Sequence, residues 1–120
     1  MIIGLDIDGT ITRHPEFFAF VSQALICAGH EVIVVTFRQD RESATLDLAE
    51  WGISYSRLVT WDPALWGHER MLRWKGEVCR DLNIGVLFED DPQVLSLVHP
   101  ETVSMMVVDH EVHPLQRLAD

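Results

Sequence analysis

Short apolar runs alternate with amphipathic stretches along the whole chain. The apolar runs lie at residues 2–7, 31–36, 56–60, 85–88 and 102–108, and β-branched side chains are frequent in them. Runs of this length with few polar interruptions predict strands that are covered on both faces. Because helical patterns separate them, we expect a three-layer, Rossmann-like α/β fold, with a parallel five-stranded sheet and helices on both faces.

Capping signals mark where the intervening helices begin and end. Residues 16–29 predict a helix that ends at a glycine C-cap, because the following apolar residues have helical spacing: Phe17, Phe20, Val21, Ala24, Leu25 and Ala28. Asp40 is a typical N-cap for a helix that runs to about Trp51. Asp91 followed by proline is a strong start signal for another helix.

Length and composition narrow the class of protein. The 120 residues, 48% of them apolar, predict one domain over 1–120 with an ample core. The net charge of −10, from 19 acidic and 9 basic residues, argues against broad binding to nucleic acid or to a membrane surface but permits a small anionic substrate. Two cysteines without a CxxC spacing, and no apolar run long enough for a signal peptide or a membrane span, predict a cytoplasmic protein.

Five carboxylates follow two of the predicted strands. The first strand ends in Asp6 and Asp8, and the fourth ends in Glu89, Asp90 and Asp91. Parallel strands place their carboxyl ends at one edge of the sheet, where ligands bind. Two like charges ~4 Å apart repel by roughly 4 kcal/mol at an effective dielectric of ~20, so either a cation compensates them or some of the groups stay protonated. An all-oxygen ligand set favours Mg²⁺ as that cation. Helix capping and solvation are the alternative, which suits Asp91 best and Asp6 least.

Lys75 is the one lysine among nine basic residues. It falls on an apolar helical stripe with Met71, Val78 and Leu82. A lysine on such a stripe often extends its ammonium to solvent, but a nearby carboxylate cluster offers a better partner. Gly76 weakens the helix here, so a second possibility is a helix that begins near Trp74 and carries Lys75 in its first turn, at the ligand edge.

The order of these residues along the chain resembles that of a known enzyme superfamily. "DIDGT", then "VVT", then a lysine, then "VLFEDD" resembles the four motifs of the haloacid dehalogenase (HAD) superfamily of phosphohydrolases. The resemblance implies that Asp6 is the nucleophile, forming an aspartyl-phosphate, and that Asp8 is the general acid and base. It implies that Thr36 holds a phosphoryl oxygen and that Lys75 screens the nucleophile and the phosphate.

The same resemblance implies a magnesium site. Its ligands would be Asp6, the backbone carbonyl of Asp8, and Asp90. The family's fourth motif contains an acidic pair, and here either Glu89–Asp90 or Asp90–Asp91 fits that pattern; Asp90 belongs to both. Gly9 and Arg38 are the candidate substrate-binding positions, because glycine allows the turn after the first strand and arginine can grip a phosphate.

The segments between the motifs are too short for a cap domain in addition to the expected helices and strands. A capless site suits a phosphorylated macromolecule as well as a small molecule, unless a neighbouring subunit of a homo-oligomer covers it. Trp61 and Trp66 follow the third strand, where they either stack on a base or sugar or serve packing or a dimer contact.

Two other functions have part of this pattern. A response-regulator receiver domain has a similar length and sheet, but its phosphoacceptor aspartate ends the third strand, where this chain has Thr60. A non-catalytic, HAD-like phosphate-binding module is the second alternative, and the presence of both Asp6 and Asp8 argues against it. The expected activity is therefore a Mg²⁺-dependent phosphatase.

Overall fold

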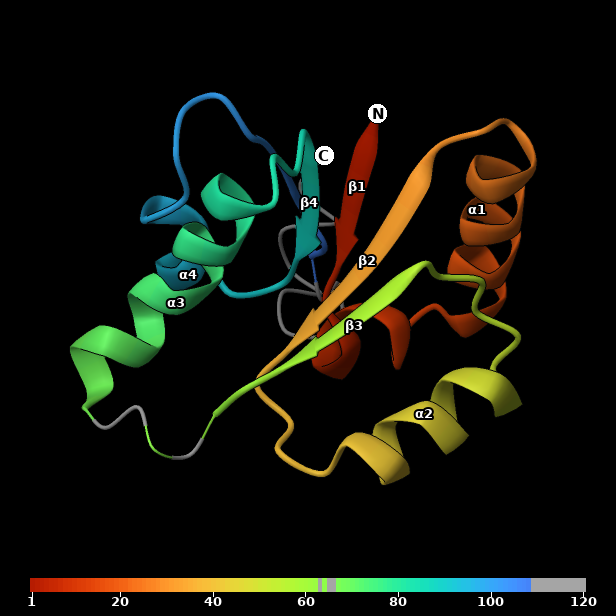
Figure 1. Cartoon of the computed structure of the whole chain (residues 1–120), viewed down its shortest axis with the longest axis horizontal. Helices are drawn as coiled ribbons and strands as arrows, with labels where there is room; N and C mark the ends of the chain where they lie inside the picture. The colour runs from red at the N-terminus through yellow and green to blue at the C-terminus, as the bar shows by residue number, and fades with distance from the viewer. Residues whose placement is uncertain (63, 65–66, 109–120) are drawn as a thin grey trace, which may run out of the picture.

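A computed structural model describes residues 1–62, 64 and 67–108 (Figure 1). Its five strands form one parallel sheet in the order β3-β2-β1-β4-β5. The strands are β1 (Ile2–Leu5), β2 (Glu31–Thr36), β3 (Arg57–Thr60), β4 (Val86–Glu89) and β5 (Val103–Met106). The predicted five-stranded parallel α/β fold is confirmed.

The helices cover both faces of this sheet. They are α1 (Pro15–Cys27), α2 (Arg41–Glu50), α3 (His68–Asp81) and α4 (Pro92–Ser96). In Figure 1, α1 and α2 lie on one side of the strands, and α3 and α4 lie on the other. Asp40 and Asp91 cap α2 and α4 as predicted, accepting hydrogen bonds from the backbone N–H groups of Ser43 and Gln93. No helix within the described residues has the length and apolar content needed to cross a membrane.

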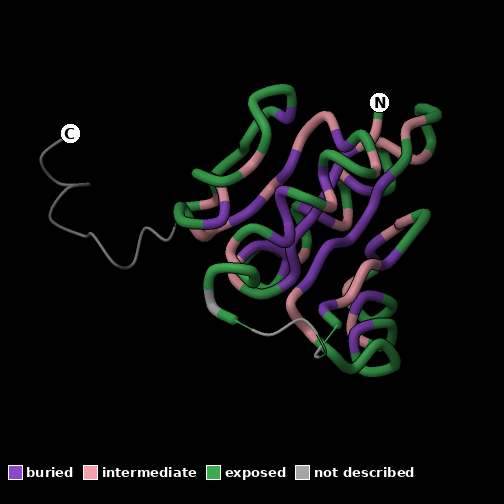
Figure 2. Tube along the Cα trace, turned by 60° about the vertical axis from the view of Figure 1, so that its left-hand side comes forward, coloured by how far each residue is buried: buried purple, intermediate pink, exposed green. Residues whose placement is uncertain are grey.

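Alternate side chains of the central strands enter two separate cores. On β2, Val32 and Val34 pack with α1 and α2, whereas Ile33 and Val35 pack with α3. All four are buried, which explains why β2 reads as a continuous apolar run. Figure 2 shows the buried residues concentrated along these strands, with exposed residues outside them.

Helix α1 forms where the apolar spacing predicted it, but its buried face is made of other residues. Phe17 and Phe20 are 53% and 71% exposed, and the buried positions of the helix are Phe18 and Ser22. Phe18 packs edge-on against Phe88 of β4, with ring centroids 5.5 Å apart. Helix α1 carries apolar side chains on most of its circumference, so their spacing alone could not show which side faces the sheet. The contact between Phe18 and Phe88 determines that side.

The first strand is shorter than predicted and ends at Leu5 rather than at residue 7. Asp6 still donates its backbone N–H to the carbonyl of Phe88, at 3.0 Å, and the chain then turns through the segment η1 (Ile7–Ile11). Gly9 has a φ of 86° in this turn, a conformation that favours glycine. Asp6 is thus the first residue beyond the strand, and Asp8 lies on the turn.

The helix that carries Lys75 begins at His68, so the expectation of a start near Trp74 is wrong. Gly76 has a packing role instead. A Cβ atom at this position would lie 2.5 Å from the carbonyl oxygen of Leu97, at the end of α4. The glycine therefore lets α3 and α4 approach closely, and Lys75 lies within α3 with its side chain fully buried.

Candidate functional site

A buried ammonium group joins the ends of the two central strands. The Nζ atom of Lys75 lies 2.6 Å from Oδ1 of Asp6, which follows β1, and 2.5 Å from Oε1 of Glu89, which ends β4. Lys75, Asp6 and Glu89 are at most 4% exposed. The ammonium also lies 4.5 Å from the centre of the Phe37 ring. Its side chain does not extend to solvent; it pairs with the carboxylate cluster instead.

A third carboxylate, that of Asp90, lies close to the two that contact the ammonium. Asp6, Glu89 and Asp90 each place one carboxylate oxygen within 4.8 Å of the others. The second oxygen of Asp6 accepts a hydrogen bond from the hydroxyl of Thr10, at 3.0 Å. The second oxygen of Glu89 accepts from the backbone N–H groups of Asp90 and Asp91. These contacts fix Asp6 and Glu89 in place, and the three oxygens are spaced closely enough to hold one metal ion.

Burial and the neighbouring charges shift the pKa values of the three carboxyl groups in different directions. Burial raises the pKa of Asp6 to about 8, because Lys75 opposes the effect only in part and Glu89 adds to it. Burial and the neighbouring Glu89 also raise the pKa of Asp90. Burial acts against ionised Glu89 as well, but Lys75 and the hydrogen bonds from Asp90 and Asp91 outweigh it, so the pKa of Glu89 is lowered. A further cation at this cluster would favour the ionised forms of Asp6 and Asp90 over their protonated forms.

Asp8 is separate from this cluster. Both of its carboxylate oxygens accept hydrogen bonds from Arg38, from Nε and Nη2, each at 2.9 Å. This paired arrangement lowers the pKa of Asp8, with Arg38 as the main cause. The side chain of Asp8 is 61% exposed. The two candidate acid–base and substrate-binding residues, Asp8 and Arg38, are therefore bound to each other.

The remaining predicted positions lie close by in the fold. Thr36 ends β2, next to β1, and its buried hydroxyl accepts a hydrogen bond from the backbone N–H of Arg38, at 3.1 Å. Gly9 donates its backbone N–H to the hydroxyl of Thr12. A side chain at Gly9 would overlap the carboxylate of Asp90, so this glycine leaves the space that Asp90 occupies.

The two acidic pairs left open by the sequence differ in the structure. Glu89 and Asp90 both face Asp6, whereas the carboxylate of Asp91 caps α4 by accepting the N–H of Gln93. Two further residues, Thr10 and Asp47, contact the predicted site residues Asp6 and Arg38, and neither was predicted from the sequence. Thr10 belongs to the "DIDGT" run, four residues after Asp6. No sequence signal pointed to Asp47.

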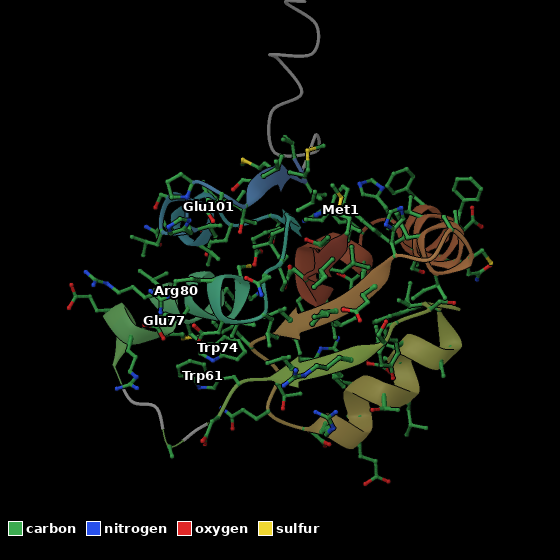
Figure 3. All side chains as sticks on the ribbon, turned by 45° about the horizontal axis from the view of Figure 1, so that its top comes forward. Met1, Trp61, Trp74, Glu77, Arg80 and Glu101 are labelled. Carbon is green, nitrogen blue, oxygen red and sulfur yellow. The ribbon has the colours of Figure 1, made fainter. Side chains whose placement is uncertain are left out.

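Trp61 packs in the core, which is one of the two roles predicted for it from the sequence. It is 7% exposed and lies edge-on to Trp74, with ring centroids 5.1 Å apart, in the core beneath α3 (Figure 3). Phe37 completes this aromatic cluster. Trp66, the other tryptophan that was considered for stacking, lies outside the described residues.

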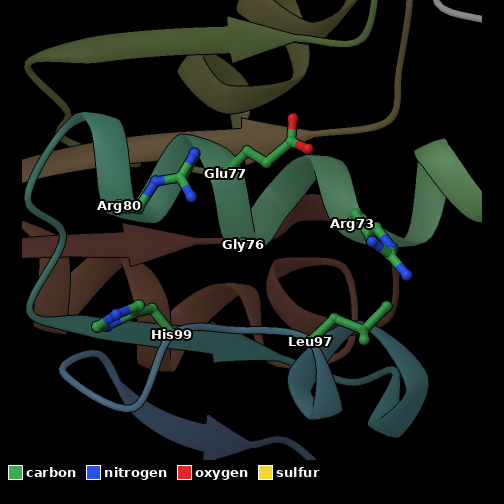
Figure 4. A pocket seen from close by; sticks show the side chains of 6 residues that line it. All are labelled: Arg73, Gly76, Glu77, Arg80, Leu97 and His99. Carbon is green, nitrogen blue, oxygen red and sulfur yellow. The ribbon is translucent and has the colours of Figure 1, made fainter.

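A cavity among the described residues lies elsewhere. It has a volume of about 370 Å³ and lies between α3 and the segment that leaves α4 (Figure 4). It is lined by Arg73, Gly76, Glu77, Arg80, Leu97 and His99. None of the predicted site residues lines it, and it holds no group of carboxylates. The convergent chemistry is at the carboxyl edge of the sheet, so we place the candidate site there.

Comparisons with known proteins agree on the fold. No family model and no curated protein matches the sequence. Two solved chains match the structure, one from the structure of the Pnkp1/Rnl/Hen1 RNA repair complex and one from a structure of the Pnkp1/Rnl/Hen1 complex. Each aligns with a TM-score of 0.70 over 89% of this chain, at 20% and 21% sequence identity. The alignments span 42% and 45% of those chains, less than half of their length.

Replacing Lys75 by methionine would leave the buried carboxylates of Asp6 and Glu89 without their cation. We expect a loss of about 3–5 kcal/mol in the free energy of unfolding at pH 7.5, measured by denaturant titration in EDTA. Without the ammonium, the folded-state pKa values of both carboxyl groups rise. A raised carboxyl pKa favours the folded state at low pH, and this benefit is lost as the pH rises, so the penalty should be smaller at pH 5.

The matched control is Arg73→Met, which removes a cation from the same helix. Arg73 is exposed and its nearest carboxylate, Glu69, lies 3.8 Å away, so this change should cost less than about 1 kcal/mol at either pH. If the two variants were equally stable, the ammonium of Lys75 would not be needed to keep the carboxylates together.

Proposed function

We propose that this protein is a Mg²⁺-dependent phosphatase of the haloacid dehalogenase type, which hydrolyses a phosphoric monoester through an aspartyl-phosphate on Asp6. The observation that carries the proposal is the convergence of Asp6, Lys75 and the Glu89–Asp90 pair from three elements that are distant in the sequence. These residues come from three of the four motifs in which the sequence resembles that superfamily, and Thr36, from the other motif, ends the strand beside Asp6.

Asp6 has the surroundings that a phosphoryl acceptor needs. In the proposed reaction, a carboxylate oxygen of Asp6 attacks phosphorus, and the bond from phosphorus to the ester oxygen breaks. Two anions must approach each other, so most of the catalysis is positioning and charge neutralisation. Lys75 contributes one fixed positive charge beside Asp6, and the hydrogen bond from Thr10 orients the carboxylate. Thr36 would hold a phosphoryl oxygen through its hydroxyl.

Asp8 is the proposed proton donor and acceptor. Beside Arg38 its lowered pKa keeps Asp8 ionised, so it would first take up a proton from solvent when the substrate binds. It would pass that proton to the departing alkoxide, so that an alcohol leaves, and then take a proton from the water that hydrolyses the aspartyl-phosphate. Inorganic phosphate is the second product, and Asp6 is regenerated. The exposure of Asp8 on the η1 turn supports this role, because the leaving group and the water arrive from solvent. Arg38, which pairs with Asp8, is a candidate ligand for the substrate phosphate.

A divalent cation fits the donor set. Asp6 and Asp90 would hold it, with Glu89 beside them, and oxygen ligands of this kind suit Mg²⁺. When bound, Mg²⁺ supplies positive charge that stabilises the transferring phosphoryl group. Burial is the main cause of the raised pKa values of Asp6 and Asp90, and a bound cation would oppose it by favouring the ionised carboxylates.

The substrate class is open between small molecules and macromolecules. The matching solved chains come from a complex described as acting in RNA repair, which adds an oligonucleotide with a terminal phosphate to the candidate substrates. The net charge of −10 argues that such a strand would be held locally at the site rather than along a basic surface. A panel of phosphate esters should therefore contain both kinds.

Substitution of Asp6 tests its proposed role as the nucleophile. Asp6→Asn keeps the size of the side chain but removes its nucleophilic oxygen, so hydrolysis of every ester that the protein accepts should fall at least about a thousandfold. The measurement is phosphate release in Mg²⁺ buffer, compared with Asp81→Asn, an exposed aspartate at the end of α3, which should behave like the unmodified protein. EDTA should abolish turnover, and added Mg²⁺ should restore it.

Turnover that persists in Asp6→Asn, or that ignores EDTA, would contradict the proposed mechanism. If the unmodified protein binds inorganic phosphate but hydrolyses nothing in the panel, the alternative of a non-catalytic phosphate-binding module takes its place.

The second prediction concerns the pH dependence of Mg²⁺ binding. With a pKa of about 8, Asp6 holds a proton at pH 6 to 7 in the metal-free protein, and that proton must leave before the carboxylate can bind the ion. The apparent affinity for Mg²⁺ should therefore rise about tenfold from pH 6 to pH 7 and level off above pH 8. Calorimetry in two buffers of different ionisation enthalpy should record about one proton released at pH 6.5. An affinity that does not vary with pH would show that Asp6 is not a ligand of this kind.

A further inference from the structure

Helix α2 holds the guanidinium group of Arg38 from the side opposite Asp8. Nη1 of Arg38 lies 2.7 Å from Oδ2 of Asp47, and the guanidinium carbon lies 5.8 Å from the centre of the Trp51 ring. Asp47 and Trp51 are four residues apart, one turn of helix, so they present a carboxylate and an aromatic ring on one side of α2. Arg38 is thus held between α2 and the η1 turn.

This arrangement fixes the orientation of the guanidinium plane. A guanidinium group donates from a rigid planar fork, so a bond to Asp47 at Nη1 determines where Nε and Nη2 point. Those two atoms make the parallel bonds to Asp8. The backbone of Arg38 is also fixed, because its N–H donates to Thr36 and its carbonyl accepts from Trp61. The guanidinium group that binds Asp8 is therefore fixed in place just after the end of β2.

Helix α2, which carries Asp47, is itself held firmly against the core. Ala44 and Leu48 of α2 are fully buried in the core, and Asp40 caps its first turn. Asp47 lies between these anchors, with 37% of its side chain exposed. An ion pair this exposed adds little to the stability of the fold. What it contributes to the site is the orientation of the Arg38 guanidinium.

We propose that Asp47 is a positioning residue: with Trp51 it fixes Arg38, and Arg38 in turn aims the carboxylate of Asp8. This inference rests on the proposed function, in which Asp8 transfers protons. Asp8 lies on a turn and is mostly exposed, and its carboxylate is outside the group formed by Asp6, Glu89 and Asp90. The bonds from Arg38 are the hydrogen bonds that its carboxylate accepts among the described residues. Orientation of Asp8 therefore comes from α2 by way of Arg38.

The leaving group of the substrate provides the test. A good leaving group such as p-nitrophenolate departs with little help from an acid, whereas an alkoxide needs its proton. Asp47→Asn should lower kcat/KM about tenfold or more for an alkyl phosphate and less than about threefold for p-nitrophenyl phosphate. The matched control is Glu50→Gln, which removes one negative charge from the same helix at an exposed position and should change neither value.

Equal losses for the two substrates would overturn the proposal, because they would mean that Arg38 serves the phosphate group common to both. Unchanged kinetics in Asp47→Asn would overturn it as well. The comparison uses kcat/KM because this ratio includes departure of the leaving group but not the later hydrolysis of the aspartyl-phosphate.

A second measurement does not depend on turnover. The Nε–Hε signal of Arg38 in a ¹⁵N NMR spectrum, assigned by its loss in Arg38→Lys, should shift and exchange faster with water in Asp47→Asn but not in Glu50→Gln. A signal that is identical in all three proteins would show that Asp47 does not hold Arg38. If the unmodified protein hydrolyses no ester, the proposed function fails, and this measurement still decides whether α2 fixes the guanidinium.

Discussion

The contact between the buried ammonium of Lys75 and the carboxylates of Asp6 and Glu89 is the interaction on which the site depends. It joins α3 to the ends of β1 and β4, the strands at the centre of the sheet. Buried ion pairs contribute little net stability, since desolvation offsets the attraction, but removing one partner is costly. The ammonium therefore serves mainly to specify the arrangement. It allows two carboxylates to be buried side by side and leaves a third, Asp90, at their margin.

The order of the strands explains why these groups meet. Chain connections run outward from β1 to β2 and β3 on one side, and from β4 to β5 on the other, so the strand order reverses between β1 and β4. A crevice forms at such a point at the carboxyl end of a parallel sheet. Asp6 directly follows β1, and Glu89 ends β4, so both lie at this point of the sheet. Gly9, with its positive φ and absent side chain, allows the η1 turn to pass Asp90 without a clash.

The sequence was sufficient to predict the sheet and most of the site. The apolar runs predict the strands, and the capping residues Asp40 and Asp91 predict the starts of α2 and α4. Parallel pairing of the strands then brings Asp6, Glu89 and Asp90 to one edge of the sheet. The exposed face of α1 could not be predicted, because its apolar residues surround the helix and the contact with Phe88 is tertiary. Gly76 was misread as a helix-weakening signal, since its reason is the backbone of Leu97 packed against it.

The pairing of Asp8 with Arg38, and of Arg38 with Asp47, also escaped prediction. The motifs predicted separate roles for Asp8 and Arg38 and none for Asp47, and only the placement of α2 beside the η1 turn brings the three side chains together. Two neighbouring carboxylates in one motif thus have different surroundings. Asp6 is buried beside Lys75 and has a raised pKa, whereas Asp8 is exposed beside Arg38 and has a lowered one.

The central claim is that Lys75 and one divalent cation together neutralise the carboxylates at the end of β1 and β4. The most direct test is a crystal structure of the protein grown with Mn²⁺, in which anomalous scattering locates the metal independently of the atomic coordinates. The account predicts one strong peak in coordination contact with oxygens of Asp6 and Asp90, with the ammonium of Lys75 still between Asp6 and Glu89. A peak at another acidic surface, or none at this edge in crystals that contain the ion, would contradict it.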